Sequence, residues 1–299
     1  MTVITISGRE LYLWRERATA SAIANKISIQ EVDWLLQEIT ELDKLSLRLL
    51  SFKENSGIKI SKSLEELNRL WEIRLQENFP IQYLLGTVYW RNFKLKVTPA
   101  VLIPRPETEL IIDIAIEAQK NQKLAIASEH WTDLGTGSGA IALGLAESMP
   151  NAKIHAVDCS QEALNVAREN ACNLNLESRI NFYCGSWWSP LNSLQGKVRG
   201  MISNPPYIPS AQISQLQPEV AKHEPHLALD GGRDGLSDIR YLVETAPDYL
   251  APGGIWLIEM MAGQSKIVKQ LLEESGKYDR IQIIPDFSHI DRFALAYRL

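Results

Sequence analysis

Apolar residues recur at spacings of three and four along the first eighty residues of the chain. The pattern begins after Ser7, Ser28 and Ser63, and it places the apolar side chains of each stretch on one face of a helix. Each serine also precedes a glutamate by three residues, which is the capping-box pattern of a helix start: Ser7 with Glu10, Ser28 with Glu31, and Ser63 with Glu66. The pattern therefore predicts a small helical bundle over residues 1–80.

The pattern changes to near alternation between residues 81 and 106. Tyr89, Trp90, Phe93 and Leu95 have the spacing of paired strands, and a group of prolines that ends at Pro106 then breaks the pattern. This segment is interpreted as a β-hairpin that joins two domains.

Short apolar runs alternate with helical stretches over residues 107–299, which indicates a doubly wound α/β sheet. Seven strands are expected, at Trp131–Leu134, Ile154–Val157, Ile180–Cys184, Met201–Ser203, Ile255–Met260, Ile281–Ile284 and Phe293–Tyr297. The connection between the last two is too short for a helical crossover, so these strands should pair antiparallel in an otherwise mostly parallel sheet.

Charge excludes one broad class of partner. The chain has 31 Lys and Arg against 36 Asp and Glu, a formal net charge of -5, so no global basic field attracts a polyanion. Stable nucleic-acid binding is therefore not expected. No run approaches the ~20 apolar residues that span a bilayer, so no membrane association is expected either.

Cysteine and histidine spacing gives no sign of a metal site. Three cysteines without a C-x-x-C spacing fit neither a disulfide framework nor a zinc site, and they are interpreted as reduced thiols of a cytoplasmic protein. His223 and His226 flank a proline that breaks the geometry of a helical metal pair. No metal is expected.

A glycine-rich loop follows the first predicted strand of the sheet, where open α/β sheets bind ligands. It runs from Asp133 to Gly139 and comprises, after Asp133 and Leu134, Gly135, Thr136, Gly137, Ser138 and Gly139. Its G-x-G-x-G spacing differs from both the dinucleotide and the triphosphate loops, which favours a nucleoside ligand without phosphate. Asp158, at the end of the second strand, could accept hydrogen bonds from ribose hydroxyls. S-adenosylmethionine fits both features, and Asp133 could either brace the loop or face the ammonium group of the ligand.

A second candidate loop, Asn204-Pro205-Pro206-Tyr207, follows the fourth strand at the same edge of the sheet. Its prolines fix an extended backbone. The side-chain carbonyl of Asn204 and the backbone carbonyl of Pro205 could accept both hydrogens of a planar NH₂ group, and Tyr207 could stack on the flat acceptor. These residue types favour methyl transfer to an amide or amino nitrogen by orientation and fixed dipoles, since the loop offers no strong base.

The chain resembles the release factor glutamine methyltransferase family over nearly its whole length. Besides the two loops, the resemblance rests on Pro80-Ile-Gln-Tyr83, Ile103-Pro-Arg-Pro-Glu-Thr108, Glu224-Pro225, Asp234-Gly235, Pro252-Gly-Gly254 and Asp291-Arg292-Phe293. It implies a Rossmann-like class I methyltransferase domain and an N-terminal domain that docks the protein substrate. The single modest cleft that the sequence predicts suggests a monomer.

The resemblance also implies the reaction and the contact residues. A methyl group would pass from S-adenosylmethionine to the amide N5 of the glutamine in the Gly-Gly-Gln motif of peptide chain release factors. Residues 135–139, Asp158, Trp187 and Asn204 would contact the cofactor, with Trp187 beside the adenine, and residues 204–207 would hold the glutamine. Two residues depart from the family pattern: Ser186, where an acidic residue is common, bears on the adenine contacts, and Met260-Met261 after Glu259 bears on packing at the end of the fifth strand.

Two other functions are compatible with the same motifs. An amino-methyltransferase acting on adenine or cytosine would present a similar NH₂ group to Asn204 and Pro205, although the acidic charge balance disfavours it. A non-catalytic adaptor that only binds the cofactor is disfavoured by the intact Asn204–Tyr207 loop.

Overall fold

The computed structural model describes residues 4–122 and 129–299, which fall into two compact units that meet between Gly86 and Thr87. The first unit consists of the helices α1 (Gly8–Ala24), α2 (Ile29–Ile39), α3 (Lys44–Leu49), α4 (Leu64–Glu77) and α5 (Ile81–Leu85). Its core contains Leu11, Trp14, Leu35 and Leu67, which are almost fully buried. The spacing of apolar residues after each serine cap accounts for this packing.

The three serines do cap helices, but only one of them forms a reciprocal capping box. Ser7 accepts a hydrogen bond from the backbone of Glu10, whose carboxylate accepts one from the Ser7 backbone. Glu31 instead binds Arg74, and Glu66 binds Lys62. The first unit also contains a two-stranded antiparallel sheet, β1 (Ile4–Ile6) with β2 (Ile58–Ile60), which the helical pattern did not predict.

The second unit begins with the hairpin β3 (Thr87–Trp90) and β4 (Phe93–Lys96), which pair antiparallel. The hairpin lies against the helix α8 (Gln161–Asn173), where the Asn170 side chain accepts a hydrogen bond from Lys96 N and donates one to Lys96 O. The hairpin is therefore part of the larger unit.

Among the described residues, the main sheet has seven strands in the order β10-β11-β9-β8-β5-β6-β7. They are β5 (His130–Leu134), β6 (Lys153–Asp158), β7 (Ile180–Cys184), β8 (Val198–Ser203), β9 (Leu250–Glu259), β10 (Tyr278–Pro285) and β11 (Asp291–Arg298). Strands β9 to β7 are parallel, and β11 pairs antiparallel with both β9 and β10, as expected from the short connection between the last two strands.

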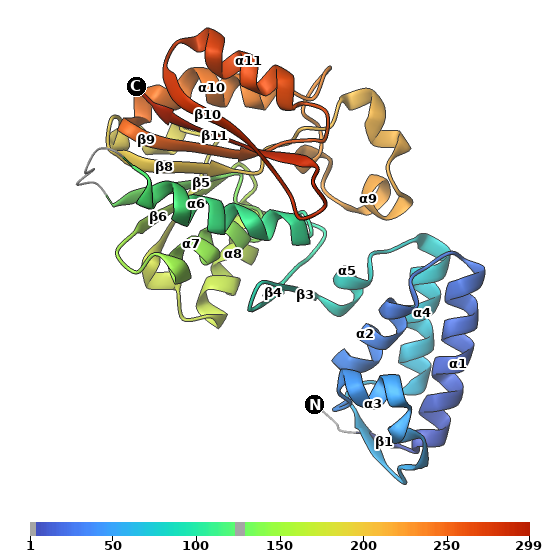
Figure 1. The fold of residues 1–299 in the computed structure, drawn as a ribbon. Coiled ribbons are helices and arrows are strands. Elements are labelled where there is room, and N and C mark those ends of the chain that lie inside the picture. The colour runs from blue at the N-terminus through green and yellow to red at the C-terminus, as the bar shows by residue number, and fades with distance from the viewer. Residues whose placement is uncertain (1–3, 123–128) are drawn as a thin grey trace. The chain divides into compact units, whose positions relative to one another are not determined.

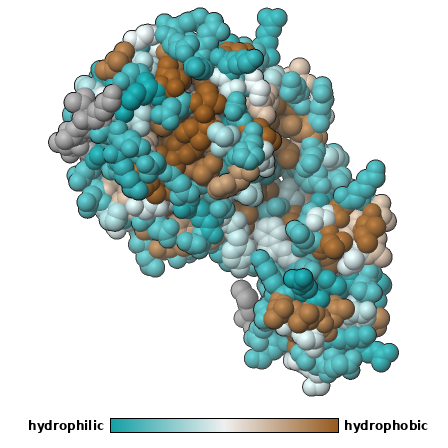
Figure 2. Space-filling view, in the orientation of Figure 1, coloured by the Kyte–Doolittle hydropathy of each residue, from teal (hydrophilic) through white to brown (hydrophobic). Residues whose placement is uncertain are grey.

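Helices cover both faces of the sheet (Figure 1). One face carries α6 (Leu110–Lys120), α7 (Ala140–Ser148) and α8, and the other carries α10 (Ser237–Tyr249) and α11 (Ser265–Ser275). A short helix, α9 (Pro218–His223), lies in the long segment between β8 and α10. Seen as a surface, apolar side chains gather in patches among mainly polar ones (Figure 2). No helix of residues 4–122 and 129–299 is long and apolar enough to cross a membrane.

Candidate active site

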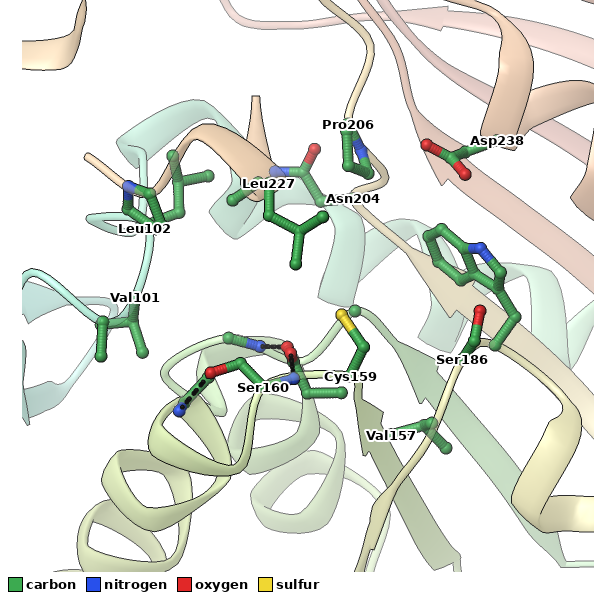
Figure 3. A pocket seen from close by; sticks show the side chains of 18 of the residues that line it. Val101, Leu102, Val157, Cys159, Ser160, Ser186, Asn204, Pro206, Leu227 and Asp238 are labelled. Atoms are coloured by element: carbon green, nitrogen blue, oxygen red, sulfur yellow. Dashed lines mark hydrogen bonds between the residues drawn. The ribbon is translucent and has the colours of Figure 1, made fainter. Parts of the chain in front are cut away.

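A cavity of about 290 Å³ opens at the carboxyl edge of the parallel strands, within the second unit (Figure 3). It is lined by residues of both loops singled out in the sequence, including Gly135, Gly137, Asp158, Asn204 and Pro206. A hydrogen bond of 2.6 Å from Ser203 Oγ to the carbonyl oxygen of Leu134 joins the starts of the two loops. The volume is close to the lower end of the range for small-molecule sites.

The glycines give the first loop its shape. Gly135, Gly137 and Gly139 have φ values of 77°, 54° and 85°, a left-handed region that side chains with a Cβ rarely adopt. A Cβ on Gly139 would also lie 3.1 Å from the Cβ of Ala167. The loop can therefore turn tightly below the cavity and expose its backbone there.

Asp133 braces this loop from inside the protein. It is fully buried and accepts hydrogen bonds from Thr136 Oγ1 at 2.5 Å and Ala142 N at 3.0 Å, both on Oδ2. Its Oδ1 has no hydrogen-bond partner among the described residues, so one buried acceptor atom is left unsatisfied in the interior. Burial raises the pKa of Asp133 to about 7. Asp133, Thr136, Ser138 and Gly139 are not among the residues lining the cavity, and the structure therefore gives them a supporting place.

Asp158 lies at the end of β6 and lines the cavity. Its Oδ2 accepts a hydrogen bond of 2.8 Å from Gly137 N, and its Oδ1 one of 2.9 Å from Ser160 N. Burial raises the pKa of Asp158, against the opposing effect of these two bonds. Each carboxylate oxygen has more than one lone pair, so Asp158 can still accept hydrogen bonds from a vicinal diol.

Trp187 forms another wall of the cavity, and its own backbone is unusual, with φ at 50°. Its ring lies above the loop, 3.7 Å from where a Cβ of Gly135 would stand. Asp238, at the start of α10, also lines the cavity; burial raises its pKa, and a hydrogen bond with the Trp187 side chain lowers it. Ser186 lines the cavity beside Trp187, so the serine that departs from the family pattern faces the ligand space.

The acceptor loop is divided between the cavity and the protein interior. Asn204 and Pro206 line the cavity, and Figure 3 shows the Asn204 amide there, whereas Pro205 is buried and Tyr207 is half-buried. The Tyr207 hydroxyl donates a hydrogen bond of 3.2 Å to Glu259 Oε1, and the Tyr207 carbonyl accepts one of 3.1 Å from Gln264 Nε2. Tyr207 is thus held at both ends.

Glu259 supports the loop from the end of β9. It is 1% exposed, and its other carboxylate oxygen accepts a hydrogen bond of 2.6 Å from Thr108 Oγ1. Burial raises the pKa of Glu259 to about 7. Arg105 makes a partly buried contact nearby, with its Nη2 2.7 Å from both oxygens of Glu224.

Several lining residues had no signal in the sequence. Val101, Leu102, Leu227 and Asp238 reach the cavity from segments without a motif. Only their position next to the matched segments Ile103–Thr108, Glu224-Pro225 and Asp234-Gly235 could have suggested them.

The chain shares its fold with α/β methyltransferases. Residues 114–233 match the family described as methyltransferase small domain. The fold is similar to that of the hMettl16 catalytic domain, solved in complex with a 3′UTR hairpin, with a TM-score of 0.55 over 88% of each chain at 13% identity.

Full-length relatives define the family within that class. The chain is 52% identical to a release factor glutamine methyltransferase of Synechocystis sp., over 98% of each chain. It is 46% identical to that of Thermosynechococcus vestitus, over 97% of this chain and 99% of the relative. The chain belongs to the release factor glutamine methyltransferase family.

Proposed function

We propose that this enzyme transfers a methyl group from S-adenosylmethionine to the side-chain amide N5 of the glutamine in the Gly-Gly-Gln motif of peptide chain release factors. The observation that carries the proposal is the meeting of two loops at one cavity, with Asp158 and Gly137 on one side and Asn204 on the other. The names of the full-length relatives support a glutamine of a release factor over a nucleobase as the acceptor.

The residues around the cavity fit the cofactor. Asp158 would accept the ribose hydroxyls, the backbone of residues 135–139 would pass beneath the ligand, and Trp187 would contact the adenine. Asp133 would brace the loop from inside, because it is fully buried and is not among the residues lining the cavity. When bound, the cofactor supplies an electrophilic methyl group on a sulfonium.

Asn204 and Pro205 would orient the acceptor. An amide nitrogen is a weak nucleophile because its lone pair is delocalised into the carbonyl. The Asn204 side-chain carbonyl and the Pro205 backbone carbonyl would accept its two hydrogens, and Pro206 and Tyr207 would pack on the flat amide. These fixed dipoles stabilise positive charge that develops on nitrogen during transfer. The released proton can pass to solvent afterwards.

Mass spectrometry of a purified release factor, incubated with the enzyme and methyl-labelled S-adenosylmethionine, tests the proposal. We expect one labelled methyl group on the Gly-Gly-Gln glutamine. With Asn204→Ala, the methylation rate should fall by a factor of about 100 or more. The control is Asn181→Ala, at an exposed position near the start of the outer strand β7, and this variant should keep the wild-type rate. Absence of label with wild-type enzyme would reject the release factor as substrate, and an unchanged rate with Asn204→Ala would reject the assigned role of that residue.

A further inference from the structure

The turn between β10 and β11 exposes an aromatic side chain at the active-site edge of the sheet. This hairpin tip, residues 286–290, contains Phe287 with 81% of its surface exposed and Ile290 with 39%. Phe287 is the most exposed large apolar side chain among the residues that the structure describes. Such exposure in a single side chain has no benefit for folding.

Hydrogen bonds and an ion pair hold the backbone of the hairpin tip. Asp286 N donates to Ile290 O at 2.8 Å, and Asp286 Oδ1 accepts from Ser288 N at 2.8 Å and Ile290 N at 3.0 Å. The same aspartate pairs with Arg292 at 3.4 Å and is only 9% exposed. The loop therefore has a fixed backbone that holds Phe287 in solvent.

Strand register places this tip at the carboxyl edge of the parallel strands, the edge at which the acceptor loop lies. Ser203, the residue before the acceptor loop, pairs with Ile258, and Glu259 pairs with Phe293 near the start of β11. The backbone of Met260 donates a hydrogen bond of 2.8 Å to Arg292 O, so the chain beyond β9 stays attached to the base of the tip. Figure 1 shows the β10–β11 turn at the end of the sheet where the α9 segment lies.

A different exposed apolar residue borders the cavity itself. Leu227, in the segment after α9, lines the cavity and is 65% exposed (Figure 3). When a glutamine of a folded protein enters the cavity, the residues beside that glutamine must contact the protein surface around the cavity opening. Exposed aromatic side chains on rigid loops are typical anchors of protein interfaces.

We propose that the hairpin tip docks the protein substrate, with Phe287 packed against an apolar part of the substrate surface beside the acceptor glutamine. The inference rests on the proposed function, and it adds a recognition element outside the acceptor loop. Because the tip contacts neither the amide nor the cofactor, it acts on the affinity for the intact protein and not on the methyl transfer itself.

Steady-state kinetics with an intact release factor test the inference in the full chain. For Phe287→Ser we expect a KM for the release factor about tenfold higher, since loss of an interface anchor commonly has an effect of that size. The kcat at saturating substrate and the Kd for S-adenosylmethionine should stay within twofold of wild type. Phe287→Leu should recover most of the affinity. Ile267→Ser, on an exposed position of α11, is the matched control and should change none of these values.

The possible results distinguish a docking role of Phe287 from other roles of the tip. A KM for Phe287→Ser within twofold of wild type overturns the docking role. A lower Tm of the full-length variant would show that Phe287 is covered by side chains of its own chain, and would overturn it as well. A lower kcat with unchanged KM would mean that the tip supports the acceptor loop instead. If wild-type enzyme methylates no release factor, the proposed function fails, which is a different result from an active enzyme unaffected by Phe287→Ser.

Discussion

At the scale of single residues, Glu259 is a buried acid whose charge changes near neutral pH. Burial raises its pKa from 4.5 to about 7; the hydrogen bonds from Thr108 and Tyr207 and the charge of Arg292 lower it, and Glu107 raises it. Because the folded pKa exceeds the unfolded one, the native state binds more protons between pH 4.5 and 7. The free energy of unfolding therefore falls as the pH rises through this window, and the cost of ionising Glu259 is fully present above it.

We predict that Glu259→Gln becomes more stable relative to wild type as the pH rises from 5 to 8, because glutamine cannot ionise. The lost acceptor for Thr108 or Tyr207 adds a cost that is the same at every pH. Thermal denaturation of both proteins across this range checks the prediction, and contributions from other groups such as Asp133 cancel in the difference. Parallel curves of Tm against pH would show that Glu259 does not titrate in this range.

At the scale of elements, the turn before α10 has a packing requirement that the sequence motif does not reveal. Gly235 has φ at 76°, and a Cβ there would lie 2.3 Å from the carbonyl oxygen of Tyr207. Gln264 Nε2 donates hydrogen bonds of 3.1 Å to both Tyr207 O and Gly235 O. The turn and the acceptor loop are therefore in direct contact, and a change in one moves the other.

We predict that Gly235→Ala lowers the methylation rate at least tenfold while the Kd for S-adenosylmethionine changes little. Gly276→Ala is the matched control, since Gly276 also has a positive φ, at 62°, but nothing lies within 4 Å of its Cβ position. That variant should lose about 1 kcal/mol of stability from backbone strain and keep its activity. Equal losses of activity in the two variants would show that strain, and not contact with Tyr207, is the cause.

The strands β5, β6 and β7 share a row of titratable side chains on one face. His155 Nε2 lies 2.8 Å from His130 Nδ1, and its Nδ1 lies 3.1 Å from the Tyr183 hydroxyl. Burial, together with the nearby charges of His130 and Lys153, lowers the pKa of His155 to about 4. Because the folded pKa is below the unfolded value of 6.5, stability is lost as the pH falls from 6.5 towards 4.

We predict that His155→Gln loses less stability than wild type between pH 7 and pH 5. Glutamine keeps hydrogen-bonding capacity between its neighbours but takes up no proton. Urea midpoints at the two pH values measure the effect. If the midpoints of both proteins shift equally, another group causes the acid sensitivity.

At the scale of the whole molecule, the sequence predicted the larger architecture well because the central strands of the sheet are buried apolar runs of sufficient length. It did not predict β1 and β2, which have three residues each and are too short for a periodic signal. The partners of Glu31 and Glu66 were also missed, since the glutamate of a predicted capping box can instead form an ion pair, with Arg74 of another helix for Glu31 and with Lys62 four residues earlier for Glu66.

The candidate site was likewise predicted only in part from the sequence. The rule that ligands bind at the carboxyl edge predicted that Asp158 and Asn204 lie close together, and both line one cavity in the structure. Asp238, Leu227 and Glu259 could not be placed, because they reach the site through tertiary packing of segments 20 or more residues from the loops. The contact roles of the individual residues, and the docking role of residues 1–80, stay predictions.

The division into two units provides the last prediction. Among the described residues, those that line the cavity lie between Ala100 and Asp238, and the first unit has a core of its own around Trp14 and Leu35. A fragment of residues 87–299 should therefore fold and bind S-adenosylmethionine with a Kd within about threefold of the full chain, as isothermal titration calorimetry can measure. If the first unit docks the release factor, the KM of the fragment for that substrate should rise at least tenfold, because part of the interface is lost. A fragment that keeps the full-chain KM would assign recognition to the second unit alone, and a folded fragment that no longer binds the cofactor would show that the first unit shapes the cavity.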